Sequence, residues 1–162
     1  MRKWLSLVGL GLVTGCSQPA NDNTTISLTD VVDPTYKVGQ VWQYHTRPSE
    51  PNSTLTIVKI ELASSDTIVH VHIADVKLKT DTVGTSYQNT IGHSPFSRAA
   101  ITASVTKLVT VVQILPEYEE GYSLWRKAYL SGNGGIFSTP VSQSVGDTEE
   151  TSLIGTKTTE AP

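Results

Sequence analysis

Hydrophobic and polar residues alternate through the first half of the chain. Within Val41–Arg47, Trp42 and Tyr44 fall on one side of an extended backbone, and Gln43 and His45 fall on the other. This period of two residues is typical of a strand with one buried face.

Two further stretches have the same character. Thr54–Leu62 and Thr67–Ala74 are rich in threonine, valine and isoleucine, which favour strands, and a short turn at 63–66 separates them. Val76–Thr80 extends the third strand or begins a fourth after a bulge at Asp75. The short connections predict an antiparallel meander.

The pattern becomes helical in the second half. After a polar loop at 81–92, Ser94 and Pro95 are the residue types of a helix start. Four apolar residues then recur at helical spacing, namely Ile101, Val105, Leu108 and Val112. We therefore expect a helix from Pro95 that ends by Thr110, because its valines weaken it.

A second helix is predicted between Pro116 and Gly132, with the glycine as a left-handed cap. Glutamates fill its first turn, where the helix dipole favours anions. The aromatic residues at helical spacing are Tyr118, Tyr122, Trp125 and Tyr129. Ile136-Phe137 predicts a last short strand, followed by a turn of helix from Thr139-Pro140 to Val145.

Strands followed by helices predict an α+β fold, with a small antiparallel sheet of about three to five strands and two to three helices packed on one face. Residues 36–145 form the single predicted domain. Residues 16–35 are predicted to be a flexible tether, in which Ile26–Val32 can add an edge strand. Residues 146–162, rich in Thr, Glu, Ser and Gly, are predicted to be a disordered tail.

The first residues have the order of a secretion signal. Arg2 and Lys3 precede an apolar run, Leu5–Val13, that is too short to span a bilayer as a helix but suits a signal core. The run ends in Val13-Thr14-Gly15-Cys16. This sequence resembles the lipobox of bacterial lipoproteins.

The lipobox resemblance implies a signal peptide at 1–15 and lipidation of Cys16 by diacylglycerol and usually a palmitate-type N-acyl chain. Two or more chains anchor a protein stably in a bilayer. Ser17, in place of an aspartate, implies sorting to the outer membrane, facing the periplasm. An ordinary secretory signal with a free thiol, or a short membrane helix, is the alternative.

The folded part also resembles a family of small uncharacterised bacterial proteins. The matching segments are Tyr36–Pro48, Ser53–Ile57, Lys59–Glu61 and the run His93, Pro95, Phe96 and Ser97. The resemblance covers roughly residues 36–140. It implies a fold that occurs with and without a lipid anchor, and it implies no activity.

Charge and cysteine content exclude several classes of protein. The net charge is −3, and removal of Arg2 and Lys3 with the signal would lower it from −3 to −5. Nucleic-acid binding and electrostatic docking on anionic lipid both need a basic face. A single cysteine excludes a disulfide within the chain.

Three histidines are a candidate metal site. His70 and His72 point to one side of a predicted strand, and His45 lies on a predicted neighbour. Three imidazoles on one sheet face suit zinc. The alternative is a solvent-facing set that alternates by chance, and no cofactor is otherwise indicated.

Aromatic residues and one arginine are candidates for binding a partner. Trp42 and Tyr44 on the first strand and Tyr122 and Trp125 on the second helix either pack together as core or line a groove for a peptide or glycan. Arg47 either holds a ligand carboxylate or forms a salt bridge with Glu50.

No nucleophile elbow, phosphate loop or carboxylate pair appears in the sequence. We therefore expect a membrane-anchored periplasmic lipoprotein, more a binding or structural module than an enzyme. Its partners would be the bilayer, through Cys16, and an envelope protein or peptide. An immunity- or inhibitor-type protein and a metal-binding enzyme that uses His70 and His72 are the alternatives.

Overall fold

The computed structural model describes residues 27–81 and 83–159, with side chains to residue 154. The strands are β1 (Leu28–Asp30), β2 (Gln40–Tyr44), β3 (Thr54–Ala63), β4 (Asp66–Lys79), β5 (Tyr87–Ser97) and β6 (Val105–Val111). The helices are α1 (Arg98–Ser104), α2 (Glu119–Leu130) and α3 (Val141–Thr159). The predicted signal peptide and Cys16 lie outside the described residues.

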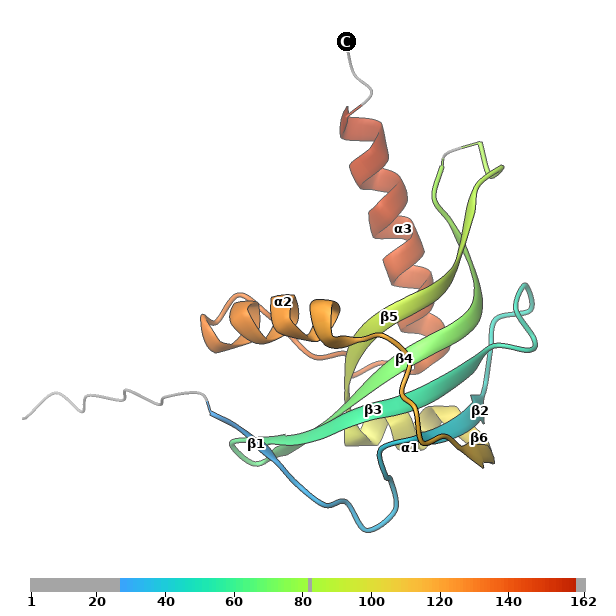
Figure 1. Cartoon of the computed structure of the whole chain (residues 1–162). Helices are drawn as coiled ribbons and strands as arrows, with labels where there is room; N and C mark the ends of the chain where they lie inside the picture. The colour runs from blue at the N-terminus through green and yellow to red at the C-terminus, as the bar shows by residue number, and fades with distance from the viewer. Residues whose placement is uncertain (1–26, 82, 160–162) are drawn as a thin grey trace, which may run out of the picture.

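These strands form one antiparallel sheet in the order β5-β4-β3-β2-β6, with β1 paired to β3 (Figure 1). The α+β class is confirmed, although the six-stranded sheet exceeds the three to five strands expected. Where the residues are described, no helix combines the length and the apolar character needed to cross a membrane.

The predicted meander is present as β2, β3 and β4. The turn after β3 pairs Ala63 with Asp66, and Ser64 takes a left-handed conformation with φ 55°. Asp75 is also left-handed, with φ 56°, and the pairing of β4 with β5 is irregular between Ala74 and Leu78. The predicted bulge therefore bends one long strand and does not start a new one.

The predicted first helix is wrong for most of its length. It begins after Ser97, whose hydroxyl accepts a hydrogen bond from the Ala100 amide at 3.1 Å, and it ends at Ser104. The following residues form β6, which pairs with β2. Valines favour the extended backbone, and pairing with β2 stabilises a strand at these residues. The helical spacing of their apolar side chains therefore led to a wrong prediction.

β5 occupies residues that were predicted to be loop and helix start. Its sequence lacks alternation because it is an edge strand, where proline is tolerated. Pro95 needs no amide there, and its carbonyl accepts a hydrogen bond from the Phe137 amide at 2.9 Å. The expected strand at Ile136-Phe137 is a single bridge between Phe137 and Phe96.

The predicted disordered tail is also wrong, because α3 continues to Thr159. Val141 and Val145 are buried at its start. Further along, the hydroxyls of Thr148, Thr151 and Ser152 donate to carbonyls four residues earlier. These bonds satisfy polar side chains whose abundance suggested disorder.

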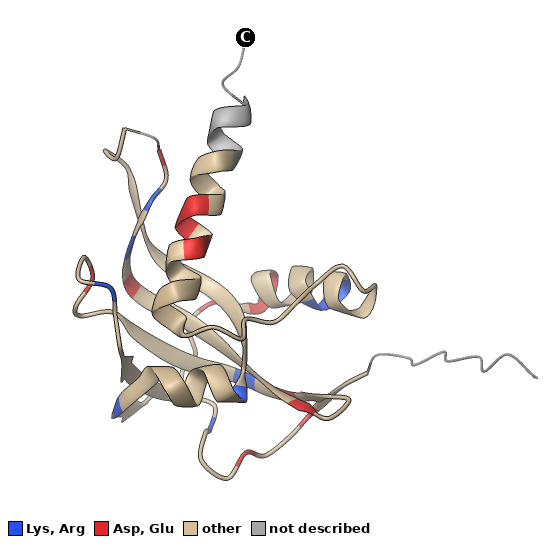
Figure 2. Ribbon diagram, turned by 180° about the vertical axis from the view of Figure 1, so that it is seen from behind, with Lys and Arg blue, Asp and Glu red and all other residues tan. Residues whose placement is uncertain are grey.

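The helices lie on both faces of the sheet, and not on one face as expected. Val69, Val71 and Ile73 of β4 form the apolar core with Ala100 and Ile101 of α1 and the buried valines of α3. His70 points the opposite way, toward α2. In Figure 1 α2 lies in front of the sheet, whereas the view from behind in Figure 2 brings α1 and α3 forward.

The folded body begins earlier than the predicted boundary at residue 36. β1 pairs with the end of β3, which confirms an edge strand within Ile26–Val32 for Leu28–Asp30. The Asp33 carboxylate accepts bonds from the amides of Thr35 and Tyr36 and from Arg98. Residues 28–35 are therefore part of the domain, and the predicted flexible tether is wrong for this stretch.

Candidate functional site

The aromatic residues of β2 belong to the apolar core and do not form an open groove. Tyr44 is buried, and its hydroxyl lies 2.7 Å from that of Ser53. Burial raises the pKa of Tyr44 to about 12. Trp42 packs on the core and against the Tyr36 ring. The predicted aromatic stripes thus face opposite sides of the sheet.

Arg47 forms the salt bridge predicted from its spacing to Glu50. Its guanidinium donates to both oxygens of the buried Glu50 carboxylate at 2.9 and 2.8 Å. A third bond of 2.7 Å reaches Glu149 of α3. These carboxylates raise the pKa of Arg47, and the residue fixes α3 to the strand ends.

The structure does not bring the three candidate metal ligands together. His45 is exposed just beyond the end of β2, His72 is half-buried and His70 is fully buried. β3 lies between β2 and β4 in the sheet. Within the ranges that the structure describes, no group of three or more His, Cys, Asp or Glu residues is placed to hold a metal ion.

His70 instead pairs with His93, a residue of β5. The Nδ1 atom of His70 lies 2.9 Å from Nε2 of His93, and the rings stack with centroids 5.1 Å apart. On the other side, Nε2 of His70 lies 3.1 Å from the carboxylate of Glu61. The two atoms are not aligned for a hydrogen bond, and both are buried without a hydrogen-bond partner among the described residues.

Helix α2 covers this histidine pair with two aromatic side chains. The Tyr122 ring lies edge-on to His70 at 5.3 Å, and its hydroxyl donates to Glu61 at 2.9 Å. The Trp125 ring lies 4.8 Å from His70 and 5.8 Å from His93. We call Glu61, His70, His93, Tyr122 and Trp125 the histidine cluster.

Gly121 and Trp125 determine how closely α2 packs on the histidine cluster. A Cβ atom on Gly121 would come within 2.8 Å of the Cβ of His93, so only glycine allows the helix to approach β5 this closely. The Trp125 indole donates to the Gly135 carbonyl at 2.8 Å. This bond ties the loop after α2 to the same contact.

The cluster holds its imidazoles in the neutral form. Burial, followed by the nearby His93 and Lys59, lowers the pKa of His70 to about 3. Burial lowers the pKa of His93 to about 4. Burial and then the bond to Glu61 raise the pKa of the Tyr122 phenol. One neutral imidazole donates to the other, and this bond is lost when both carry a proton.

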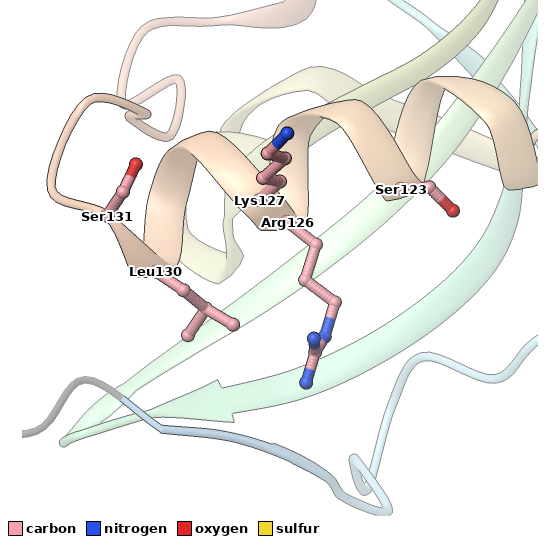
Figure 3. A pocket seen from close by; sticks show the side chains of 5 residues that line it. All are labelled: Ser123, Arg126, Lys127, Leu130 and Ser131. Carbon is pink, nitrogen blue, oxygen red and sulfur yellow. The ribbon is translucent and has the colours of Figure 1, made fainter.

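We define the outer face of α2 as Ser123, Leu124, Arg126, Lys127 and Leu130. All of these residues except Leu124 line a hollow. The hollow has a volume of about 480 Å³ and also touches Ser131 (Figure 3). Arg126 and Leu130 project to the same side of the helix in this view. Among the residues that the structure describes, neither Arg126 nor Lys127 forms an ion pair. The glutamates of the first turn of α2, Glu119 and Glu120, therefore do not neutralise these cations.

Sequence reasoning found His70, Tyr122 and Trp125 but missed Glu61 and His93. The position of Glu61 could have been predicted from the turn after β3. Pairing of Ala63 with Asp66 places Lys59 opposite His70 and Glu61 opposite Ile68. His93 carries no chemical signal in the sequence, because it lies between the predicted loop at 81–92 and the predicted helix start at Ser94.

Comparison with known protein families, curated proteins and solved structures finds no match to this chain in any of the three. Its function must therefore be argued from its own residues.

Proposed function

We propose that the protein is a lipoprotein of the bacterial cell envelope whose folded body is a binding module. In this proposal Cys16 carries the lipid, and the outer face of α2 binds a carboxylate-bearing peptide segment of an envelope partner. The lipobox pattern supports the location, and the charge of α2 supports the choice of partner.

The observation that carries the proposal is the pair of cations on α2. Arg126 and Lys127 have no ion-pair partner within the described part of the chain, although the protein as a whole is acidic. Leu124 is 68% exposed beside them, and Leu130 is 36% exposed. Cations next to exposed leucines suit a segment that alternates acidic and apolar residues.

Binding can be tested with a fluorescein-labelled peptide of alternating Glu and Leu residues and the full chain in detergent micelles. We expect Arg126→Gln/Lys127→Gln to weaken binding at least tenfold, and salt to weaken the wild type. The matched control is Lys37→Gln/Lys107→Gln, which removes two charges elsewhere. Equal affinities for the two double variants would overturn the peptide site.

Anchoring is tested separately, by substitution of Cys16 with serine. The lipid thioether cannot form on a serine side chain, so we expect the variant to leave the membrane fraction of cells. Mass spectrometry of the wild type should find acyl chains on residue 16. A serine variant that still fractionates with membranes would contradict the anchor.

A further inference from the structure

Helix α2 is attached to the sheet in a different way from the other two helices. None of its residues is fully buried, whereas α1 and α3 bury Ala100, Ile101, Val141 and Val145 in the core. The contacts of α2 with the sheet run through the histidine cluster and the close approach of Gly121 to His93. Two imidazoles therefore lie at the centre of this attachment.

Several charged groups face this pair. Glu61 lies next to His70 and favours one added proton, while Lys59, 3.7 Å from Glu61, opposes it. On α2, the groups are the Tyr122 phenol and, further out, Arg126, which acts on that phenol. A single carboxylate can compensate one imidazolium, so a second positive charge at 2.9 Å from the first has no counter-ion.

We propose that protonation of His70 and His93 releases α2 from the sheet and so removes the binding face that Arg126 and Lys127 form. The loss of peptide binding rests on the proposed function, but the release of α2 does not. Once α2 has left the sheet, each imidazole can accept a proton at its ordinary affinity. The hydrogen bond between the two rings is then no longer needed.

The depressed pKa values of the two histidines support this direction. With an ordinary pKa of about 6.5 when exposed, and pKa values of about 3 and about 4 when covered, both imidazoles bind protons better in the released state. By linkage, each shifts the balance toward release by a factor of about 30 at pH 5. The effect vanishes above pH 7, where both states are neutral.

Release can be measured as backbone hydrogen–deuterium exchange of the full chain in detergent micelles, corrected for the intrinsic rate at each pH. We expect protection of α2 to fall at least tenfold between pH 7 and pH 5, while β3 and β4 stay protected. The double variant His70→Gln/His93→Gln should keep α2 protected, and each single variant should show an intermediate fall. His45→Gln, which removes an exposed imidazole, should behave as the wild type.

Gly121→Ala provides the reference for released α2, because its methyl group would collide with His93 at any pH. Wild-type protection that stays constant down to pH 4, or an equal fall in the double variant, would overturn the proposal. Binding of the Glu-Leu peptide at pH 7.5 separates the two ideas. If α2 is released by acid but the peptide never binds, the binding proposal fails and the release stands.

Discussion

The two faces of one sheet are covered in contrasting ways. On one face, the side chains of β3, β4 and β5 meet α1 and α3 in a continuous apolar cluster whose members are almost wholly buried. On the other face, a carboxylate and two imidazoles meet a helix with no fully buried residue. The strands are shared, so the difference comes from the alternate residues along each strand.

The two faces should therefore differ in how their stability responds to pH. An apolar interface has no group whose charge changes with pH, and its free energy grows with the area that it removes from water. A polar interface loses stability whenever a buried donor or acceptor loses its partner. We therefore expect the apolar face to contribute most of the global free energy of unfolding at neutral pH, and the polar face to set the local opening of α2 and the loss of stability in acid.

The largest expected effect is on the apolar face. Phe96 is 1% exposed and packs on Phe137, so Phe96→Ala should lower the free energy of unfolding by about 4 kcal/mol through lost burial and a cavity. Urea denaturation followed by circular dichroism measures this loss. Trp125→Ala, the matched change under α2, should cost less than half as much. Equal losses would show that the two faces do not differ.

The attachment of α3 gives the next largest effect. Arg47→Met removes the guanidinium from the Glu50 carboxylate, whose side chain is 0% exposed, and from Glu149 on the helix. A buried carboxylate left without its cation should cost about 3 kcal/mol in the same assay. Arg98→Met is the control: Arg98 is 39% exposed, and the Asp33 carboxylate keeps its bonds from the amides of Thr35 and Tyr36, so its loss should be smaller. A comparable loss for both variants would contradict the buried pairing.

The imidazoles of the polar face should make the free energy of unfolding depend on pH. The folded-state pKa values of His70 and His93, about 3 and about 4, lie below the unfolded value of about 6.5. Stability is therefore complete above pH 6.5 and falls as the pH drops toward 4, because the unfolded chain then binds more protons. At pH 5, His93→Gln should remove about 2 kcal/mol of this loss.

The measurement for this pH effect is urea denaturation at pH 7.5 and pH 5. His45→Gln should leave the difference between the two pH values unchanged. If His93→Gln behaves in the same way, the covered imidazole does not lose its proton affinity on folding, and the neutral pair is wrong.

How far the sequence predicts this molecule depends on where each signal lies. The strand signal is clear in β2, where residue types alternate, and in β3 and β4, which are rich in threonine, valine and isoleucine. It is absent from β5, an edge strand that contains Pro95, and misleading in β6, whose apolar residues happen to recur at helical spacing. The chain around Val105–Val111 is extended because β2 offers a partner, which is a tertiary effect and not a local one.

The histidine cluster, too, is predictable only where its signal is local in the sequence. The sequence identifies His70 and the aromatic face of α2, because each lies on an element with a regular period. It fails for the pairing of His70 with His93, since that depends on the register between β4 and β5. It also fails for α3, where Glu149 is held by Arg47, roughly a hundred residues earlier in the chain.

The smallest expected effect isolates one hydrogen bond of the polar face. Tyr122→Phe keeps the ring beside His70 but removes the hydroxyl that donates to Glu61 at 2.9 Å. A bond to a carboxylate is stronger than a neutral one, but this pair is partly exposed, so we expect a loss of about 1 kcal/mol. The loss should appear as faster amide exchange in α2, with the urea midpoint of the sheet nearly unchanged.

Tyr118→Phe is the matched control, because the Tyr118 hydroxyl makes no hydrogen bond to any residue that the structure describes, and its ring contacts Tyr122. A double-mutant cycle with Glu61→Gln then gives the coupling between phenol and carboxylate. A coupling near zero would mean that α2 is held by ring contacts alone. In that case the charge of the two imidazoles, and not the bond to Glu61, would decide whether the helix stays on the sheet.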